Sequence, residues 1–127
     1  MATVAALGGG QLPNSANLSN GQTGNGASTN IVDSGAGSGP GLIKIVSAVG
    51  GSPTVTVAIE CSLNGTDWFP APYSDSATPT TTSVATFAIT TAATSYKHLS
   101  PGFAYRYVRL LYSANTAVTL TVDIWFT

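Results

Sequence analysis

Hydrophobic and polar residues alternate along the chain from Leu42 onward, whereas no such order is present before it. Alternation with a period of two is typical of strands that bury one face. It predicts strands at residues 42–49, 54–63, 66–69, 81–90, 105–112 and 117–126, separated by turn sequences such as GGSP and SAN. No stretch has the spacing of an amphipathic helix. We therefore expect an all-β fold, an antiparallel, jelly-roll-like β-sandwich of about six strands.

Residues 1–41 follow a different pattern, in which Gly, Asn and Ser dominate and apolar residues are isolated. Gly, Asn and Pro interrupt both helices and strands. We expect an extended N-terminal arm over residues 1–41, followed by a sandwich domain over residues 42–127. Such an arm has too few apolar groups for a core of its own and would anchor them on a partner surface. The predicted anchors are Leu7, Leu12, Leu18, Ile31 and Val32.

The dipeptide Asn64-Gly65 is typical of a two-residue hairpin turn of type I′. Such a turn would place Cys61 opposite Trp68, with both side chains on the apolar face of the hairpin. A buried thiol has a raised pKa and behaves as a small hydrophobic group. We therefore expect Cys61 to be structural rather than a nucleophile.

Glu60 and Asp67 share the outward face of the same predicted hairpin. Paired carboxylates can hydrolyse glycosides when they are separated by about 5–9 Å. Catalytic pairs usually lie in a cleft with apolar walls, and an outward strand face does not provide one. The favoured interpretation is solvation or an ion pair with Arg106 or Arg109.

The C-terminal hairpin presents aromatic residues on its outward side. In the last strand the apolar set Val118, Leu120, Val122, Ile124 and Phe126 faces inward, which leaves Trp125 on the polar face. The preceding strand places Tyr105, Tyr107 and Arg109 on one face. Tyr, Trp and Arg are enriched at interface hot spots. These residues therefore predict a contact between subunits, although the chain's own arm or the loop at residues 70–79 could also cover Trp125.

Charged residues make up 7% of the chain, and the formal net charge is −1. The cations Lys44, Lys97, Arg106 and Arg109 are too few to neutralise a nucleic acid backbone or bind an anionic membrane. The single cysteine and the single histidine, His98, predict no disulfide, no metal site, no cofactor and no catalytic triad. The first residues, MATVAALGGGQ, lack the basic and apolar segments of a signal peptide, which indicates cytoplasmic synthesis.

Two segments carry a resemblance to a known group of proteins: VTVAIECSLNGTDWFPAP, and SPGFAYRYVRLLYSANTAVTLTVDIWF after a Thr-rich strand. Together they resemble small β-sandwich virion proteins of tailed bacteriophages, over residues 54–126. Among these, the chain looks most like a capsid decoration (cement) protein. The resemblance implies a non-enzymatic protein on the outer capsid surface that binds the major capsid protein and forms a homo-oligomer, with a trimer favoured.

Two other functions remain open from the sequence. A phage tail or fibre subunit would share most of these features. A carbohydrate-binding module for host attachment would stack sugars on exposed aromatic rings, and its candidates are Trp68, Tyr73, Tyr96 and Trp125. Under the decoration hypothesis, the candidate interface residues are the five anchors of the arm together with Tyr73, Tyr105, Tyr107, Arg109 and Trp125.

Overall fold

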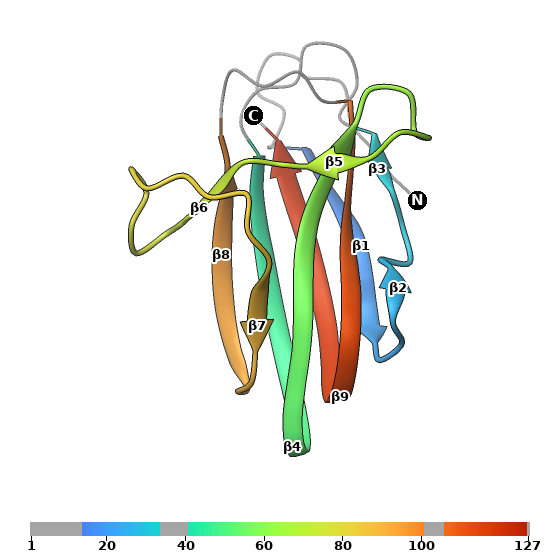
Figure 1. The fold of residues 1–127 in the computed structure, drawn as a ribbon, viewed down its shortest axis with the longest axis vertical. Helices are drawn as coiled ribbons and strands as arrows, with labels where there is room; N and C mark the ends of the chain where they lie inside the picture. The colour runs from blue at the N-terminus through green and yellow to red at the C-terminus, as the bar shows by residue number, and fades with distance from the viewer. Residues whose placement is uncertain (1–13, 34–40, 101–105, 127) are drawn as a thin grey trace.

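The computed structural model describes residues 14–33, 41–100 and 106–126, and these ranges form an all-β structure without helices. The predicted antiparallel, sandwich-like fold is confirmed (Figure 1). In the described ranges there are more strands than the expected six. They are β1 (Asn14–Gln22), β2 (Gly26–Ala27), β3 (Val32–Asp33), β4 (Gly41–Ser62), β5 (Phe69–Pro70), β6 (Tyr73–Asp75), β7 (Phe87–Ile89), β8 (Ala93–Leu99) and β9 (Tyr107–Phe126).

The two longest strands, β4 and β9, form one antiparallel ribbon that is folded over. A straight strand of 22 residues would be about 70 Å long, which is too long for a domain of this size. The register shifts between Val49 and Thr54, and Ser52, Ala114 and Ala117 have positive φ angles of 51°, 52° and 57°. Both halves of each strand then run along the long axis of the molecule (Figure 1).

The folded ribbon divides the strands into two layers. Layer A contains, in order, β1, residues 118–126 of β9, residues 41–49 of β4, β8 and β6. Layer B contains β2 and β3, residues 107–112 of β9 and residues 54–62 of β4, with β5 and β7 beside β4. The four predicted strands at 42–49, 54–63, 105–112 and 117–126 correspond to the halves of this ribbon.

The core lies between the layers and follows the predicted alternation. Its largest fully buried side chains include Ile43, Ile45, Val55, Val57, Val108, Leu110, Tyr112, Leu120 and Ile124. Ser19 in layer A and Tyr112 in layer B join the layers through a hydrogen bond of 2.9 Å between their hydroxyl groups. Removing apolar side chains of this size from water contributes about 1.5–3 kcal/mol each.

The expected division at residue 41 does not separate an arm from the sandwich over residues 14–33. β1, β2 and β3 all pair with β9, and Leu18 and Val32 are fully buried in the core. The sequence pattern did not reveal these strands, because among their Gly and Asn residues only Leu18 of β1 and Val32 of β3 belong to the apolar core. Backbone pairing with β9 compensates for the weak local preference.

Candidate interaction surfaces

Two outward faces of the sandwich carry four of the candidate interface residues: Ile31, Tyr107, Arg109 and Trp125. The Arg109 face is the outer side of layer B, with Ile31, Glu60, Trp68, Tyr107 and Arg109. The Lys44 face is the outer side of layer A, with Leu42, Lys44, Val46, Tyr96, His98, Asp123 and Trp125. On both faces the outward side chains alternate with buried ones along each strand.

The Arg109 face has a charged and aromatic cluster at its centre. Arg109 and Glu60 lie opposite each other on β9 and β4, and Arg109 Nε donates a hydrogen bond of 2.8 Å to Glu60 Oε1. The guanidinium also lies 4.1 Å from the centroid of the Trp68 ring. Both charged side chains are mostly buried, with 21% and 17% of their surface exposed. Of the two interpretations left open for Glu60, solvation or an ion pair with Arg106 or Arg109, the structure shows the ion pair with Arg109.

The position of Trp68 corrects the sequence prediction. Cys61 lies opposite Phe69 rather than Trp68, so the register differs by one residue from that of a two-residue turn. A type I′ turn needs positive φ at both central residues, and here Gly65 has φ of +77° whereas Asn64 has no positive φ. A one-residue change of register moves a side chain to the other face. Trp68 therefore leaves the core and packs on Arg109.

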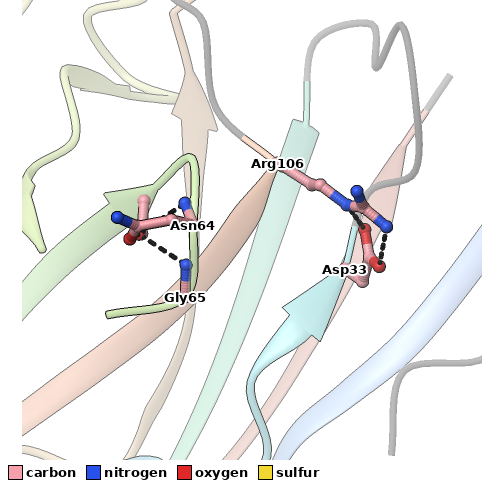
Figure 2. Close-up of polar contacts among 5 residues, drawn as sticks. Asp33, Asn64, Gly65 and Arg106 are labelled. Atoms are coloured by element: carbon pink, nitrogen blue, oxygen red, sulfur yellow. Dashed lines mark hydrogen bonds and ion pairs between the residues drawn. The ribbon is translucent and has the colours of Figure 1, made fainter. Parts of the chain in front are cut away.

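Side chains of Ser62 and Asn64 determine the shape of this loop. Ser62 Oγ accepts hydrogen bonds from the backbone N–H groups of Asn64 and Gly65, at 3.2 and 2.9 Å. Asn64 Oδ1 accepts from the N–H groups of Thr66 and Asp67, both at 2.8 Å. Figure 2 shows Asn64 and Gly65 in this loop. Leu63 at the start of the loop and Phe69 of β5 directly after it are 59% and 43% exposed.

The same end of layer B carries a second ion pair. Arg106, just before β9, donates two hydrogen bonds of 3.1 Å to the carboxylate of Asp33 at the end of β3 (Figure 2). This carboxylate raises the pKa of the Arg106 guanidinium. The guanidinium also lies 5.3 Å from the ring of Tyr107, which is half-buried. Ile31, directly before β3, is 43% exposed.

The Lys44 face is arranged in rows across β4 and β9. Lys44 lies opposite Asp123, and Leu42 lies opposite Trp125. Tyr96 and His98 of β8 extend these two rows on the other side of β4. Leu42, Lys44, His98, Asp123 and Trp125 are half-buried, while Val46 and Tyr96 are 38% and 37% exposed.

The polar contacts of the Lys44 face are few. Asp123 accepts a hydrogen bond of 2.9 Å from Asn17 of β1. Lys44 makes no ion pair with any residue in the described ranges. Across those ranges, no ring–ring or cation–ring contact involves Trp125 or Tyr96. The prediction that Trp125 faces outward agrees with this placement.

The structure does not bring all the candidate residues to a surface. Leu18 and Val32 lie in the core. Tyr73 is also buried, its hydroxyl donates to the carbonyl oxygen of Ala85 at 2.7 Å, and burial raises its pKa. It is therefore not the exposed loop residue that sugar stacking needs. Leu7, Leu12 and Tyr105 lie outside the described residues.

Cys61 occupies the predicted environment. It is 1% exposed, and burial followed by the nearby charge of Glu60 raises its pKa to about 11. No group of three or more potential metal ligands occurs in the described ranges. No helix found there is long and apolar enough to cross a membrane. The chemistry of a buried thiol below pH 11 is that of a hydrophobic group.

One buried charge was missed by sequence analysis. Lys97 of β8 points into the sandwich, is 8% exposed and forms an ion pair with Asp75 of β6. Its ammonium group lies 4.3 Å from the ring of Phe87 in layer B. A lysine at an inward position interrupts the alternation of apolar and polar residues along β8. This strand was not predicted for that reason. The adjacent His98 lies in this strand on the outward side.

Comparison with known proteins gives one structural likeness. No model of a known protein family and no curated protein sequence matches the chain. The structure is similar to that of the SPBc2 prophage-derived protein YomS, with a TM-score of 0.68 and 8% sequence identity. The likeness covers 92% of this chain and 96% of that chain. The two-layer fold described here is therefore also the fold of a protein of phage origin.

Proposed function

We propose that the chain is a non-enzymatic structural protein of a phage virion, which binds the outside of the capsid and stabilises it. The observation that supports this most is the likeness of the whole fold to a prophage-derived protein. The apolar side chains exposed on the strands and the loop at residues 63–68 provide the contact groups. Cys61 and the Glu60–Arg109 pair are held in structural contacts, which favours a non-enzymatic role.

The proposed capsid contact is the end of layer B that carries the loop, beside the Arg109 face. Leu63, Phe69 and Ile31 are exposed there, at 59%, 43% and 43%. β3, β9, β4 and β5 are neighbours at this end, through the pairs Val32–Val108, Val108–Cys61 and Cys61–Phe69. Because hydrogen bonds fix the loop in advance, binding would cost little conformational entropy. Tyr107 and Arg109 extend the contact toward the centre of the face.

The partner in this proposal is the major capsid protein, on the outer surface of the virion. The chain would be made in the host cytoplasm and would act as a homo-oligomer. A protein that binds only the assembled shell stabilises it by mass action. Several copies on one lattice add avidity without any new contact.

Capsids assembled without this protein provide the test. We expect the wild-type chain to co-sediment with them and to raise the temperature at which the shell opens. The double variant Leu63→Ser/Phe69→Ser should bind at least tenfold more weakly, since each exposed apolar group contributes about 1 kcal/mol. Val84→Ser is the matched control, because Val84 is 59% exposed but precedes β7, away from the loop. Wild-type chain that stays in the supernatant would refute the proposal.

A truncation tests the predicted anchors Leu7 and Leu12. Deletion of residues 2–13 leaves every described strand in place, whereas a deletion to residue 41 would remove Leu18 and Val32 from the core. We expect the shorter deletion to weaken capsid binding and to leave the folded domain intact by circular dichroism. Undiminished binding would remove residues 2–13 from the proposed contact.

Carbohydrate binding is a second candidate, favoured by the position of Trp68 outside the core. An indole supported by a guanidinium on the surface is a rigid stacking platform. Binding on a glycan array that is lost in Trp68→Ala would favour a host-attachment role, in a tail or fibre. Copy number separates the two functions, since a decoration protein occurs in hundreds of copies per particle and a tail-tip protein in a handful.

A further inference from the structure

We infer that two copies of the chain pair through their Lys44 faces, about a two-fold axis that runs parallel to β4 and β9 and midway between them. This inference goes beyond capsid binding and does not depend on it. It rests on the register of the two strands, on the charges that face outward and on the size of the face. Each is a property of the described residues.

The register makes the Lys44 face complementary to itself. Lys44 and Asp123 lie side by side in one row of the sheet, and Leu42 and Trp125 lie side by side in the row of the strand ends. A two-fold axis along the strands, between two facing copies, exchanges β4 and β9 but keeps each row in place. Lys44 then faces Asp123 of the second copy, and Trp125 faces Leu42 of the second copy. Each contact occurs twice, as an isologous interface requires.

The charges of the face favour such a partner. Lys44 has no ion pair in the described ranges, and Asp123 has an amide partner, Asn17, but no cation there. One cation and one carboxylate make the face neutral overall, so a second copy is not repelled. The opposite charges would meet across the contact, which selects the orientation of the pair. Trp125 and Leu42 would supply the apolar contact beside them.

The face is large enough for a stable pair. Four neighbouring strands, β1, β9, β4 and β8, form it, and the central ones are nine residues long there. At about 3.4 Å per residue and 4.8 Å between strands, its flat footprint is roughly 600 Å². Because side chains protrude from the sheet, the accessible area is larger than this footprint and approaches the roughly 800 Å² per partner that is typical of specific complexes. Its mixture of apolar and polar groups is also typical of such interfaces.

Charge reversal in sedimentation equilibrium tests the axis itself. We expect the wild-type chain to sediment as a dimer, and Lys44→Asp and Asp123→Lys each to weaken it at least tenfold, by placing like charges in contact. An equimolar mixture of the two variants should form a heterodimer with an affinity close to that of the wild type. In that heterodimer every contact across the axis joins opposite charges, while the charges within each chain remain alike.

Asp67→Lys is the control, because it makes the same charge change on the loop that follows β4 in layer B, on the other layer from the Lys44 face. It should leave the dimer unchanged, and circular dichroism should show that all variants are folded. A wild-type chain that stays monomeric or forms a trimer would overturn the inference. So would single variants that dimerise as the wild type does, or a mixture that associates no better than its components.

Discussion

The two outer faces of the sandwich differ in how their charged residues are paired. Both carry a row in which a basic residue lies opposite an acidic one on β4 and β9. On the Arg109 face, Arg109 and Glu60 form an ion pair within the chain, and the Trp68 ring packs on the guanidinium. On the Lys44 face the cation forms no ion pair in the described ranges. Charges on the first face should therefore affect the stability of the monomer, and charges on the second should affect association.

High pH should have the largest effect, because it acts on the core beneath both faces. Burial raises the pKa of Cys61 to about 11 and that of Tyr112 to about 12, from 9.0 and 10.0. A raised pKa means that the folded state favours the protonated group, so stability is complete below pH 9 and falls as pH rises through 11 and 12. Denaturant midpoints measured across this range should decrease steadily.

Cys61→Ala separates the two contributions to this loss. It should remove the part of the pH dependence that begins near pH 9 and retain the part that begins near pH 10, which belongs to Tyr112 and to Tyr73, whose pKa burial also raises. The midpoint of this variant at neutral pH provides the reference for its cavity. An identical pH profile in wild type and variant would show that the thiol does not titrate with unfolding.

Arg109→Ala should have the next largest effect, because it removes the ion pair of the Arg109 face. Glu60 would be left mostly buried without its cation, and the Trp68 ring would lose its contact with the guanidinium. We expect a loss of about 2–3 kcal/mol in the free energy of unfolding, measured by urea denaturation. Arg106→Ala is the matched control, because its ion pair with Asp33 is solvent-exposed, and it should cost clearly less. Equal losses would contradict the distinction.

Asn64→Ala should have a smaller effect, which is confined to the loop at the end of layer B. It removes the carboxamide oxygen that accepts from Thr66 and Asp67, which leaves these N–H groups to solvent. We expect a loss of about 1–2 kcal/mol and weaker capsid binding, since the loop would no longer be fixed. Thr66→Ala keeps the same backbone bonds and serves as control. Faster hydrogen exchange at residues 66 and 67 only in Asn64→Ala would locate the effect.

The sequence predicted the four halves of β4 and β9 as separate strands, because apolar and polar residues alternate within each half. It also predicted correctly that Cys61 is buried and that Trp125 faces outward. Strands at residues 14–33 were missed because they contribute Leu18 and Val32 to the core one at a time, among glycines and asparagines. Their position is determined by pairing with β9, which no local pattern reveals.

The candidate site was predicted less well, since it depends on register. Asn64-Gly65 suggested a tight turn, but backbone hydrogen bonds that the side chains of Ser62 and Asn64 accept favour a longer loop, and Trp68 changes face as a result. Lys44 was placed in a predicted strand, yet its position opposite Asp123 follows only from the pairing of β4 with β9. Alternation along a strand predicts which face of the sheet a residue lies on. Its neighbours on adjacent strands are known only once the pairing of the strands is known.

Lys44→Ala should have the smallest effect on the monomer, and this contrast is the sharpest test of the difference between the faces. Removal of a cation that has no ion pair in the described ranges should change the free energy of unfolding by no more than about 0.5 kcal/mol, measured at concentrations where the chain is monomeric. The same change should weaken self-association and reduce its dependence on salt, because the charge contact across the axis is lost. If Lys44→Ala destabilised the monomer as much as Arg109→Ala does, Lys44 would have a partner within the chain. The Lys44 face would then resemble the Arg109 face, and its charge would not be left for association.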